Sequence, residues 1–218
     1  IPREDNPKEW LGFLMFGSVP HPLTTIKGVF SLPPGSYLEM GPDSGDKIVE
    51  YWDSFCLLRN REREESFEEA ILRAREILEE SIESELVSDA PLGIFLSGGL
   101  DSSFIAAVAA QKSAIPIFTV SLDFEEEKFS ERKYQNLAAE RIRSRHYGHI
   151  LKKKEFLESR DDIFKAMDQP TIDGINTYFI SKVAREAGLK AVLSGVGADE
   201  IFWGYEHYKI AGIMRRAQ

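Results

Sequence analysis

Short apolar runs alternate with amphipathic stretches over the second half of the chain. The apolar runs predict buried strands over 92–96, 116–122, 149–151 and 191–193. Apolar residues at helical spacing predict helices over about 104–110, 130–143 and 178–187, and one or two helices over 155–167. Strands that alternate with helices build parallel sheets, so the pattern predicts an α/β fold with a parallel sheet covered by helices on both faces.

A further helix is predicted ahead of the first strand. Ser66 is typical of an N-cap, and Glu69 stands at the third helical position, which together form the pattern of a capping box. Apolar residues then follow at helical spacing: Phe67, Ala70, Ile71, Ala74, Ile77, Leu78 and Ile82. This stripe predicts a helix that packs on the sheet.

Residues 1–55 have a different texture. They are rich in Gly and Pro, as in Leu32-Pro-Pro-Gly, with short apolar stretches between the breakers. Such spacing predicts small strands and turns rather than helices. A charged connector follows, so we expect a first domain over 1–55, a linker over 56–66 and a second domain over 67–218.

Charge and composition exclude some classes of function. The formal charge of −9 argues against binding to nucleic acid or to an anionic membrane. No run reaches the roughly 18 apolar residues of a membrane span, and no signal peptide is recognisable, so a soluble, cytoplasmic protein is expected. Cys56 is the single cysteine, and the four histidines have no zinc-site spacing. We expect His146 and His149 at the surface or at helix ends.

The strand predicted over 92–96 leads into a glycine turn, Ser97-Gly-Gly-Leu-Asp-Ser, and then into a helical stretch. Two glycines at such a turn let backbone N–H groups approach an anion, and the helix N-terminus adds further donors. Ser97, Ser102 and Ser103 can add hydroxyl donors. A carboxylate beside a phosphate needs a cation between them, so Asp101 indicates Mg²⁺. The alternative is an ordinary strand–turn–helix with a capping side chain.

No lysine follows these glycines, so the turn is not a Walker P-loop. It resembles the PP-loop of ATP pyrophosphatases, which cleave ATP between its α and β phosphates. A second stretch, Ser194-Gly-Val-Gly-Ala-Asp-Glu, also follows a short apolar run and is followed by Gly204-Tyr205. Together the two motifs resemble the asparagine synthetase family, over nearly the whole chain. Taken alone, the second stretch could be a glycine-rich helix end and turn.

The resemblance implies an ATP-dependent, glutamine-hydrolysing ligase of amino-acid biosynthesis. Such an enzyme activates a carboxylate as its AMP ester, releases pyrophosphate and lets glutamine-derived ammonia attack the ester. The implied cofactors are ATP and Mg²⁺, the implied partners are a small carboxylate substrate and glutamine or ammonia, and a homodimer is a further expectation.

The resemblance also assigns site residues. Ser97, Gly98, Gly99 and Ser102 are expected on the pyrophosphate, and Ser194 and Gly195 near the α-phosphate of the nucleotide. Asp101 and Asp199 are expected on Mg²⁺. Leu96 and Val120 are expected to border the adenine, although core positions in strands explain these two residues equally well. No catalytic residue is assigned within the chain.

Two comparisons with the family pattern suggest an excised fragment. Residues 1–55 resemble the tail of the family's glutaminase domain, whose nucleophile is an N-terminal cysteine, whereas this chain starts at Ile1. The family's catalytic lysine lies well downstream of the second motif, and Lys209 is too near to be that lysine. Residues 67–218 then form the first part of the ATP-binding domain, which is expected to bind Mg-ATP at best without turnover.

Val196 departs from the family pattern. True asparagine synthetases usually carry Glu between these glycines, where it serves the acyl substrate, and valine cannot take that polar role. Relatives that form β-lactams or act on surface polysaccharide also lack the acid, so the pattern leaves the acyl substrate open.

Two other interpretations of the function compete with this one. Another PP-loop enzyme, such as a GMP, NAD or tRNA-modifying synthetase, would share the first motif but not the second. A non-catalytic nucleotide-binding or scaffold protein could have kept the fold without the reaction.

Overall fold

The computed structural model describes residues 4–41, 45–53 and 65–205. The chain divides into two compact units: Ile1–Phe67 with Arg160–Asn176, and Glu68–Ser159 with Thr177–Gln218. Cys56 and Lys209, which the sequence singled out, lie outside the described residues.

The second unit contains a four-stranded sheet. Its strands are β3 (Leu92–Phe95), β4 (Phe118–Phe124), β5 (Arg145–Leu151) and β6 (Ala191–Leu193), in the spatial order β5-β4-β3-β6. All three pairings are parallel. The predicted parallel sheet is therefore confirmed.

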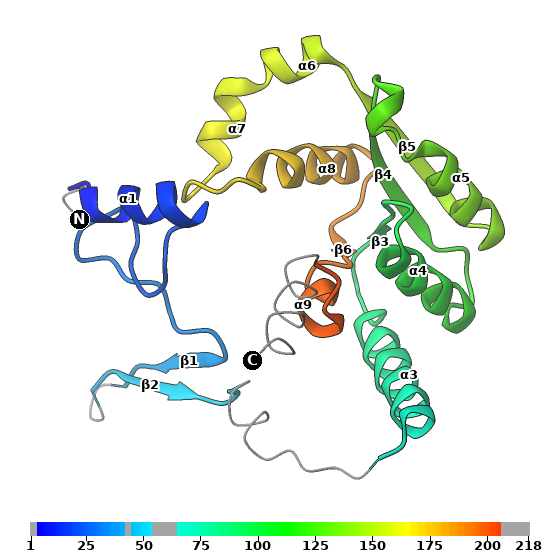
Figure 1. The fold of residues 1–218 in the computed structure, drawn as a ribbon, viewed down its shortest axis with the longest axis horizontal. Helices are drawn as coiled ribbons and strands as arrows, with labels where there is room; N and C mark the ends of the chain where they lie inside the picture. Colours follow the sequence, from blue (N-terminus) through cyan, green and yellow to red (C-terminus); the bar gives the residue numbers. More distant parts are fainter. Residues whose placement is uncertain (1–3, 42–44, 54–64, 206–218) are drawn as a thin grey trace, which may run out of the picture. The chain divides into compact units, whose positions relative to one another are not determined.

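Helices cover both faces of this sheet (Figure 1). α3 (Phe67–Glu85), α4 (Leu100–Lys112) and α5 (Arg132–Arg141) lie on one face, where Ile82, Ala106 and Ala139 form a buried cluster with Ile94 and Leu96 of the β3 segment. α8 (Gly174–Glu186) lies on the other face. There its residues Val183 and Ala184 pack with Val120 and Leu189. The central strands β3 and β4 are thus covered on both faces, as is typical of a parallel sheet.

The strand order creates a switch point between β3 and β6. From β3 the chain runs through α4 to β4 and on to β5, and it then returns to β6 on the other side of β3. The loops that leave β3 and β6 therefore diverge at the carboxyl edge of the sheet. In open α/β sheets, ligands bind in the crevice at such a point.

The start of one strand differs from the sequence prediction, whereas the neighbouring helices agree with it. β5 begins at Arg145, four residues before the predicted strand at 149, so that His146 and His149 are strand residues and not helix-end residues. The one or two helices predicted over 155–167 are two, α6 (Lys153–Glu158) and α7 (Arg160–Ala166), so this prediction is confirmed. The predicted helix at 130–143 corresponds to α5, which follows a short 3₁₀ turn, η1 (Glu127–Phe129).

The α3 helix begins at Phe67, directly after the predicted cap residue Ser66. Its apolar stripe packs on the sheet only near its C-terminal end, where Ile82 is 8% exposed. Phe67 and Ile71 nearer its start are 75% and 50% exposed. The prediction that the whole stripe packs on the sheet was therefore wrong for the first half of the helix.

The first unit contains β1 (Ser36–Glu39) and β2 (Lys47–Glu50), which pair as an antiparallel hairpin. The same segment also contains a helix, α1 (Pro7–Phe16), where the sequence predicted strands and turns only. The reason is local: Pro7 occupies the first helical position, and Gly17 ends the helix with φ +75° and an N–H that donates to the Phe13 carbonyl. The high content of Gly and Pro predicted turns throughout this segment, but Pro7 and Gly17 mark the start and the end of a helix.

Candidate functional site

The turn between β3 and α4 contains two glycines, and the first of them, Gly98, has a conformation and surroundings that exclude a side chain. Gly98 has φ +87°, a left-handed conformation that a side chain disfavours. A Cβ on Gly98 would also lie 2.9 Å from Tyr134 Cβ and 3.0 Å from the backbone nitrogen of Gln135. The turn therefore passes directly beneath the start of α5, and only glycine fits there.

Two serines hold this turn in shape. Ser97 Oγ lies 3.0 Å from Ser102 Oγ, and the Ser97 backbone N–H donates to Ser102 Oγ at 3.2 Å. Ser97 Oγ also accepts from the Gly99 N–H at 3.2 Å. Ser102 is buried, so its hydroxyl acts within the loop in this structure.

The N-terminus of α4 opens at the same place. Gly99 is its N-cap residue, and because glycine has no side chain, it cannot cap the first N–H groups of the helix. The first N–H groups of a helix have no intrahelical partner, and they favour an anion. Binding of phosphate at this turn stays a prediction.

The second motif contacts the first. Ser194 and Gly195 follow β6, which pairs with β3 through Ile94 and Leu193. A Cβ on Gly195 would lie 3.1 Å from Asp101 Cβ and 3.2 Å from the Ser102 backbone nitrogen. Sheet pairing thus brings together two motifs that are far apart in the sequence, and Gly195 permits their close approach.

The two candidate magnesium ligands come from these adjacent loops. Asp101 stands in the first turn of α4. Asp199 stands in the first turn of α9 (Ala198–Phe202), and its carboxylate lies against Gly204, where a Cβ would overlap Asp199 Oδ1. Among the described residues, no group of three or more His, Cys, Asp or Glu side chains is arranged to hold a metal. Joint binding of Mg²⁺ by the two aspartates stays a prediction.

Leu96 and Val120, the predicted adenine neighbours, are both 1% exposed. Leu96 belongs to the core on the α4 face and Val120 to the core on the α8 face. The Leu96 N–H donates to the Val120 carbonyl at 2.8 Å, which joins the end of β3 to the middle of β4. Both side chains lie in the cores, and contact of either residue with adenine stays a prediction.

Sequence reasoning missed a row of buried polar residues on β4. Thr119, Ser121 and Asp123 alternate along the strand and are at most 3% exposed. Ser121 Oγ donates to the Leu96 carbonyl, directly before the glycine turn. The alternation of these polar residues with Phe118, Val120 and Leu122 was visible in the sequence and could have revealed the row.

Asp123 anchors the segment that leads into α5. Its carboxylate accepts hydrogen bonds from Ser130 Oγ at 2.9 Å, the Glu131 N–H at 3.1 Å and Arg132 Nε at 2.8 Å. Burial by itself would raise the pKa of Asp123, but the hydrogen bonds from Ser130 and Arg132 outweigh burial and hold this pKa below its usual range. A charged Asp123 therefore fixes the start of α5 over Gly98.

The histidines of β5 have structural partners. His146 Nδ1 lies 3.0 Å from Thr119 Oγ1, and burial lowers the pKa of His146. His149 Nε2 lies 2.8 Å from Glu155 Oε2, and Lys182 Nζ lies 3.4 Å from the other oxygen of Glu155. Burial alone would raise the pKa of Glu155, but these two partners lower it overall.

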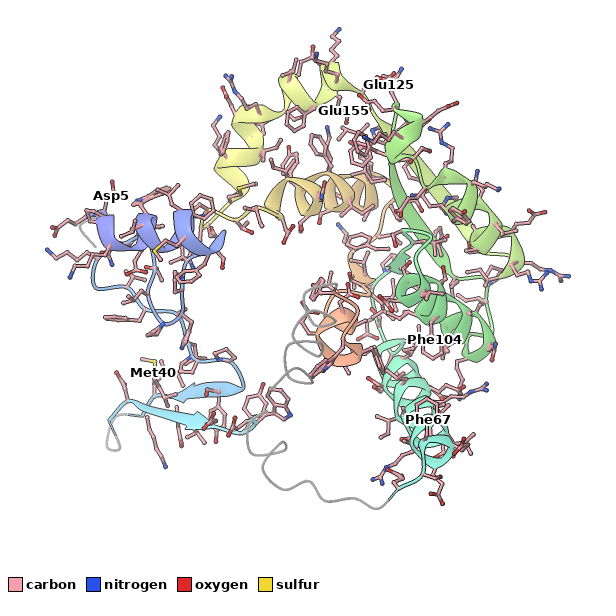
Figure 2. The ribbon with its side chains drawn as sticks, viewed as in Figure 1. Asp5, Met40, Phe67, Phe104, Glu125 and Glu155 are labelled. Atoms are coloured by element: carbon pink, nitrogen blue, oxygen red, sulfur yellow. The ribbon has the colours of Figure 1, made fainter. Side chains whose placement is uncertain are left out.

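A cavity of about 550 Å³ adjoins the two motif loops. Asp101, Ser194 and Gly195 form part of its wall, and Asp199 is not among the residues that line it. Phe104 of α4, labelled in Figure 2, lines the cavity together with residues from the second half of α3. The rest of the wall comes from β6, the following loop and α9.

The chain is similar to a known protein family and to several curated proteins. The family model described as asparagine synthase matches residues 73–218. The chain is 30% identical over 200 residues to asparagine synthetase [glutamine-hydrolyzing] 1 of Bacillus subtilis, an alignment that covers 90% of this chain and 30% of the relative. It is 28% identical over 208 residues to amidase chyE of Penicillium rubens, with 85% and 30% coverage.

The chain therefore spans about 30% of the length of these relatives. Among solved structures, it is similar to an NH3-dependent NAD synthetase from Campylobacter jejuni, with a TM-score of 0.41, 14% identity, and coverage of 60% of this chain and 58% of that chain. No helix in the described part of the chain has the length and apolar character needed to cross a membrane.

Proposed function

This chain belongs to the asparagine synthase family, and on that premise we propose that it carries the ATP-binding loops of an amide-forming ligase. In the proposed reaction a carboxylate oxygen attacks the α-phosphorus of ATP, and pyrophosphate leaves. The nitrogen of ammonia then attacks the acyl carbon of the AMP ester, loses a proton and displaces AMP. The first step turns a poor leaving group into a good one.

One observation carries this proposal: Gly195 lies directly against Asp101 and the Ser102 nitrogen, at the switch point of the sheet. The crevice at a switch point is the usual ligand site of such folds. Both loops there bring glycines to a place where a Cβ would crowd the neighbouring chain. The glycines therefore let the two loops meet at the start of α4, where the N–H groups of the first turn favour a phosphate.

We assign the pyrophosphate to the loop of Ser97, Gly98, Gly99 and Ser102, because the start of α4 has no side-chain cap and supplies N–H donors there. The two serine hydroxyls keep the turn in its binding shape through their mutual hydrogen bond. Ser194 and Gly195, which approach α4 from β6, are assigned to the α-phosphate. Leu96, which follows β3, and Val120, which lies on the neighbouring strand β4, are assigned to the adenine side.

Asp101 and Asp199 are proposed to hold Mg²⁺ with phosphate oxygens as the remaining ligands. Carboxylate and phosphate oxygens are the donors that Mg²⁺ prefers, so the residue types fit. The ion would neutralise charge on the phosphates during attack. Asp101 already lines the cavity beside these loops.

Further assignments concern the protein beyond these loops. We propose that residues 1–55 are the tail of a glutaminase domain, since the Bacillus subtilis relative is named as glutamine-hydrolysing. Glutamine would then supply the ammonia, in a cytoplasmic, dimeric enzyme.

The test is calorimetric titration of this chain with ATP in the presence and absence of Mg²⁺. We expect binding that depends on the metal and that Asp101→Asn weakens by about tenfold, because a metal-bridged carboxylate near a phosphate is lost. Asp89→Asn is the matched control: Asp89 is exposed and precedes β3, whereas Asp101 follows it. Equal affinities for the two variants and the parent chain would contradict the proposal.

A further inference from the structure

The cavity beside the motif loops exposes large apolar side chains. Leu100, Val196 and Ile201 line it and are 88%, 91% and 70% exposed. Phe104 and Phe202 add aromatic surface to the same wall. Apolar side chains gathered around a hollow in this way mark a binding site more often than an ordinary surface.

The charges on the wall are all of one sign. Glu85 and Asp101 are the charged side chains that line the cavity, and among the described residues no Lys, Arg, His, Asn or Gln side chain lines it. A ligand with a second carboxylate in its tail would find no cationic partner on this wall and would face Glu85. The wall therefore disfavours a dicarboxylate and favours an apolar ligand body.

The cavity also opens at the proposed site of chemistry. Asp101 belongs to the loop after β3, and Ser194 and Gly195 belong to the loop after β6. A carboxylic acid whose tail lay among Phe104, Val196 and their neighbours would place its carboxylate at these loops. The volume of about 550 Å³ lies within the range of roughly 300–1,000 Å³ of small-molecule sites.

We propose that this cavity holds the apolar tail of the acid that the ligase activates, so that the substrate is a monocarboxylate with an aliphatic or aromatic chain. The inference rests on the proposed function, because the tail is placed by its carboxylate at the nucleotide loops. Val196 is then a specificity-determining residue: it offers apolar surface to the tail at a point of the cavity wall where an acidic side chain would offer a charge instead.

Calorimetric titration with octanoate, and with L-aspartate as the comparison ligand, tests the inference. We expect octanoate to bind and L-aspartate not to bind. Val196→Glu should weaken octanoate binding at least about tenfold, because a like charge is placed beside the ligand. Val87→Glu is the matched control, since Val87 is 87% exposed and does not line the cavity. Ile201→Gln is a second cavity variant on an exposed position and should also weaken octanoate.

Titration with Mg-ATP on the same samples separates the two proposals. If Mg-ATP binds and octanoate does not, the inference fails and the proposed function stands. If L-aspartate binds in preference to octanoate, the assignment of an apolar substrate is wrong. If octanoate binds and Val87→Glu weakens it as much as Val196→Glu, binding is not in the cavity and the inference fails. If octanoate binds in the cavity without any binding of Mg-ATP, the proposed function fails and the substrate assignment fails with it.

Discussion

Replacing Gly98 with alanine should destabilise the second unit through two separable effects. The residue has φ +87°, where a side chain costs about 1–2 kcal/mol. The new Cβ would also lie 2.9 Å from Tyr134 Cβ and 3.0 Å from the Gln135 nitrogen. Relief of that contact requires α5 to move, and overpacking of this kind costs about 1–3 kcal/mol. The expected loss is therefore about 2–5 kcal/mol.

Gly188→Ala isolates the first effect. Gly188 has φ +83°, and a Cβ there meets nothing within 4 Å. Its loss should be limited to about 1–2 kcal/mol. Urea unfolding followed by circular dichroism gives the free energy of unfolding of each variant. Equal losses for the two variants would refute the argument that the start of α5 closes over the glycine turn.

Three further predictions concern the residues around the site. Asp123→Asn should lower the free energy of unfolding near neutral pH by about 1–3 kcal/mol, because charged hydrogen bonds to Ser130 and Arg132 are lost. The folded pKa of Asp123 is depressed, so its contribution to the free energy of unfolding is present above its unfolded pKa of about 3.9 and is lost as pH falls through the folded value. The free energy of unfolding should therefore fall less steeply with decreasing pH in Asp123→Asn than in the parent chain. The folded pKa of His146 is also lowered, so its contribution to the free energy of unfolding is present above about pH 6.5 and declines as pH falls below that value. The urea unfolding midpoints at pH 5.5 and 7.5 should therefore differ less in His146→Gln than in the parent chain. An unchanged difference between the two midpoints would contradict this assignment. Ser102→Ala should weaken Mg-ATP binding in calorimetry by about three- to tenfold, through loss of about one hydrogen bond that shapes the turn, and an affinity equal to that of the parent would argue against a shaping role.

The sheet could be predicted from the sequence because its strands are short, apolar and regularly spaced. β3 and β6 matched their predicted runs to within a residue. The two candidate motifs could be assigned to strand ends for the same reason, since both directly follow these strands. What the sequence could not supply was their contact: the order β5-β4-β3-β6 makes β6 a neighbour of β3, and strand order depends on packing across the whole sheet.

The failures have equally specific causes. α1 was missed because its signals lie only at its ends, at Pro7 and Gly17. β5 was begun too late because residues 145–148 are mostly polar or small, and their place in the sheet comes from pairing with β4 through Phe118 and Arg145 rather than from their own pattern. The buried polar row of β4 was read as an ordinary strand because its polar residues are satisfied by partners distant in sequence, such as Ser144 for Thr119.

The division of the chain into two units affects how it can be cut for expression. The segment 160–176 belongs to the first unit, although most of the chain after residue 67 belongs to the second. Within the first unit, the Ile172 N–H donates to the Gly17 carbonyl at 3.2 Å, and Ser18 pairs with Thr171. A shortened gene that begins near residue 67 would separate these partners and leave the 160–176 segment without its contacts. Co-expression of residues 1–66 as a separate polypeptide could restore them, in the manner of a split protein.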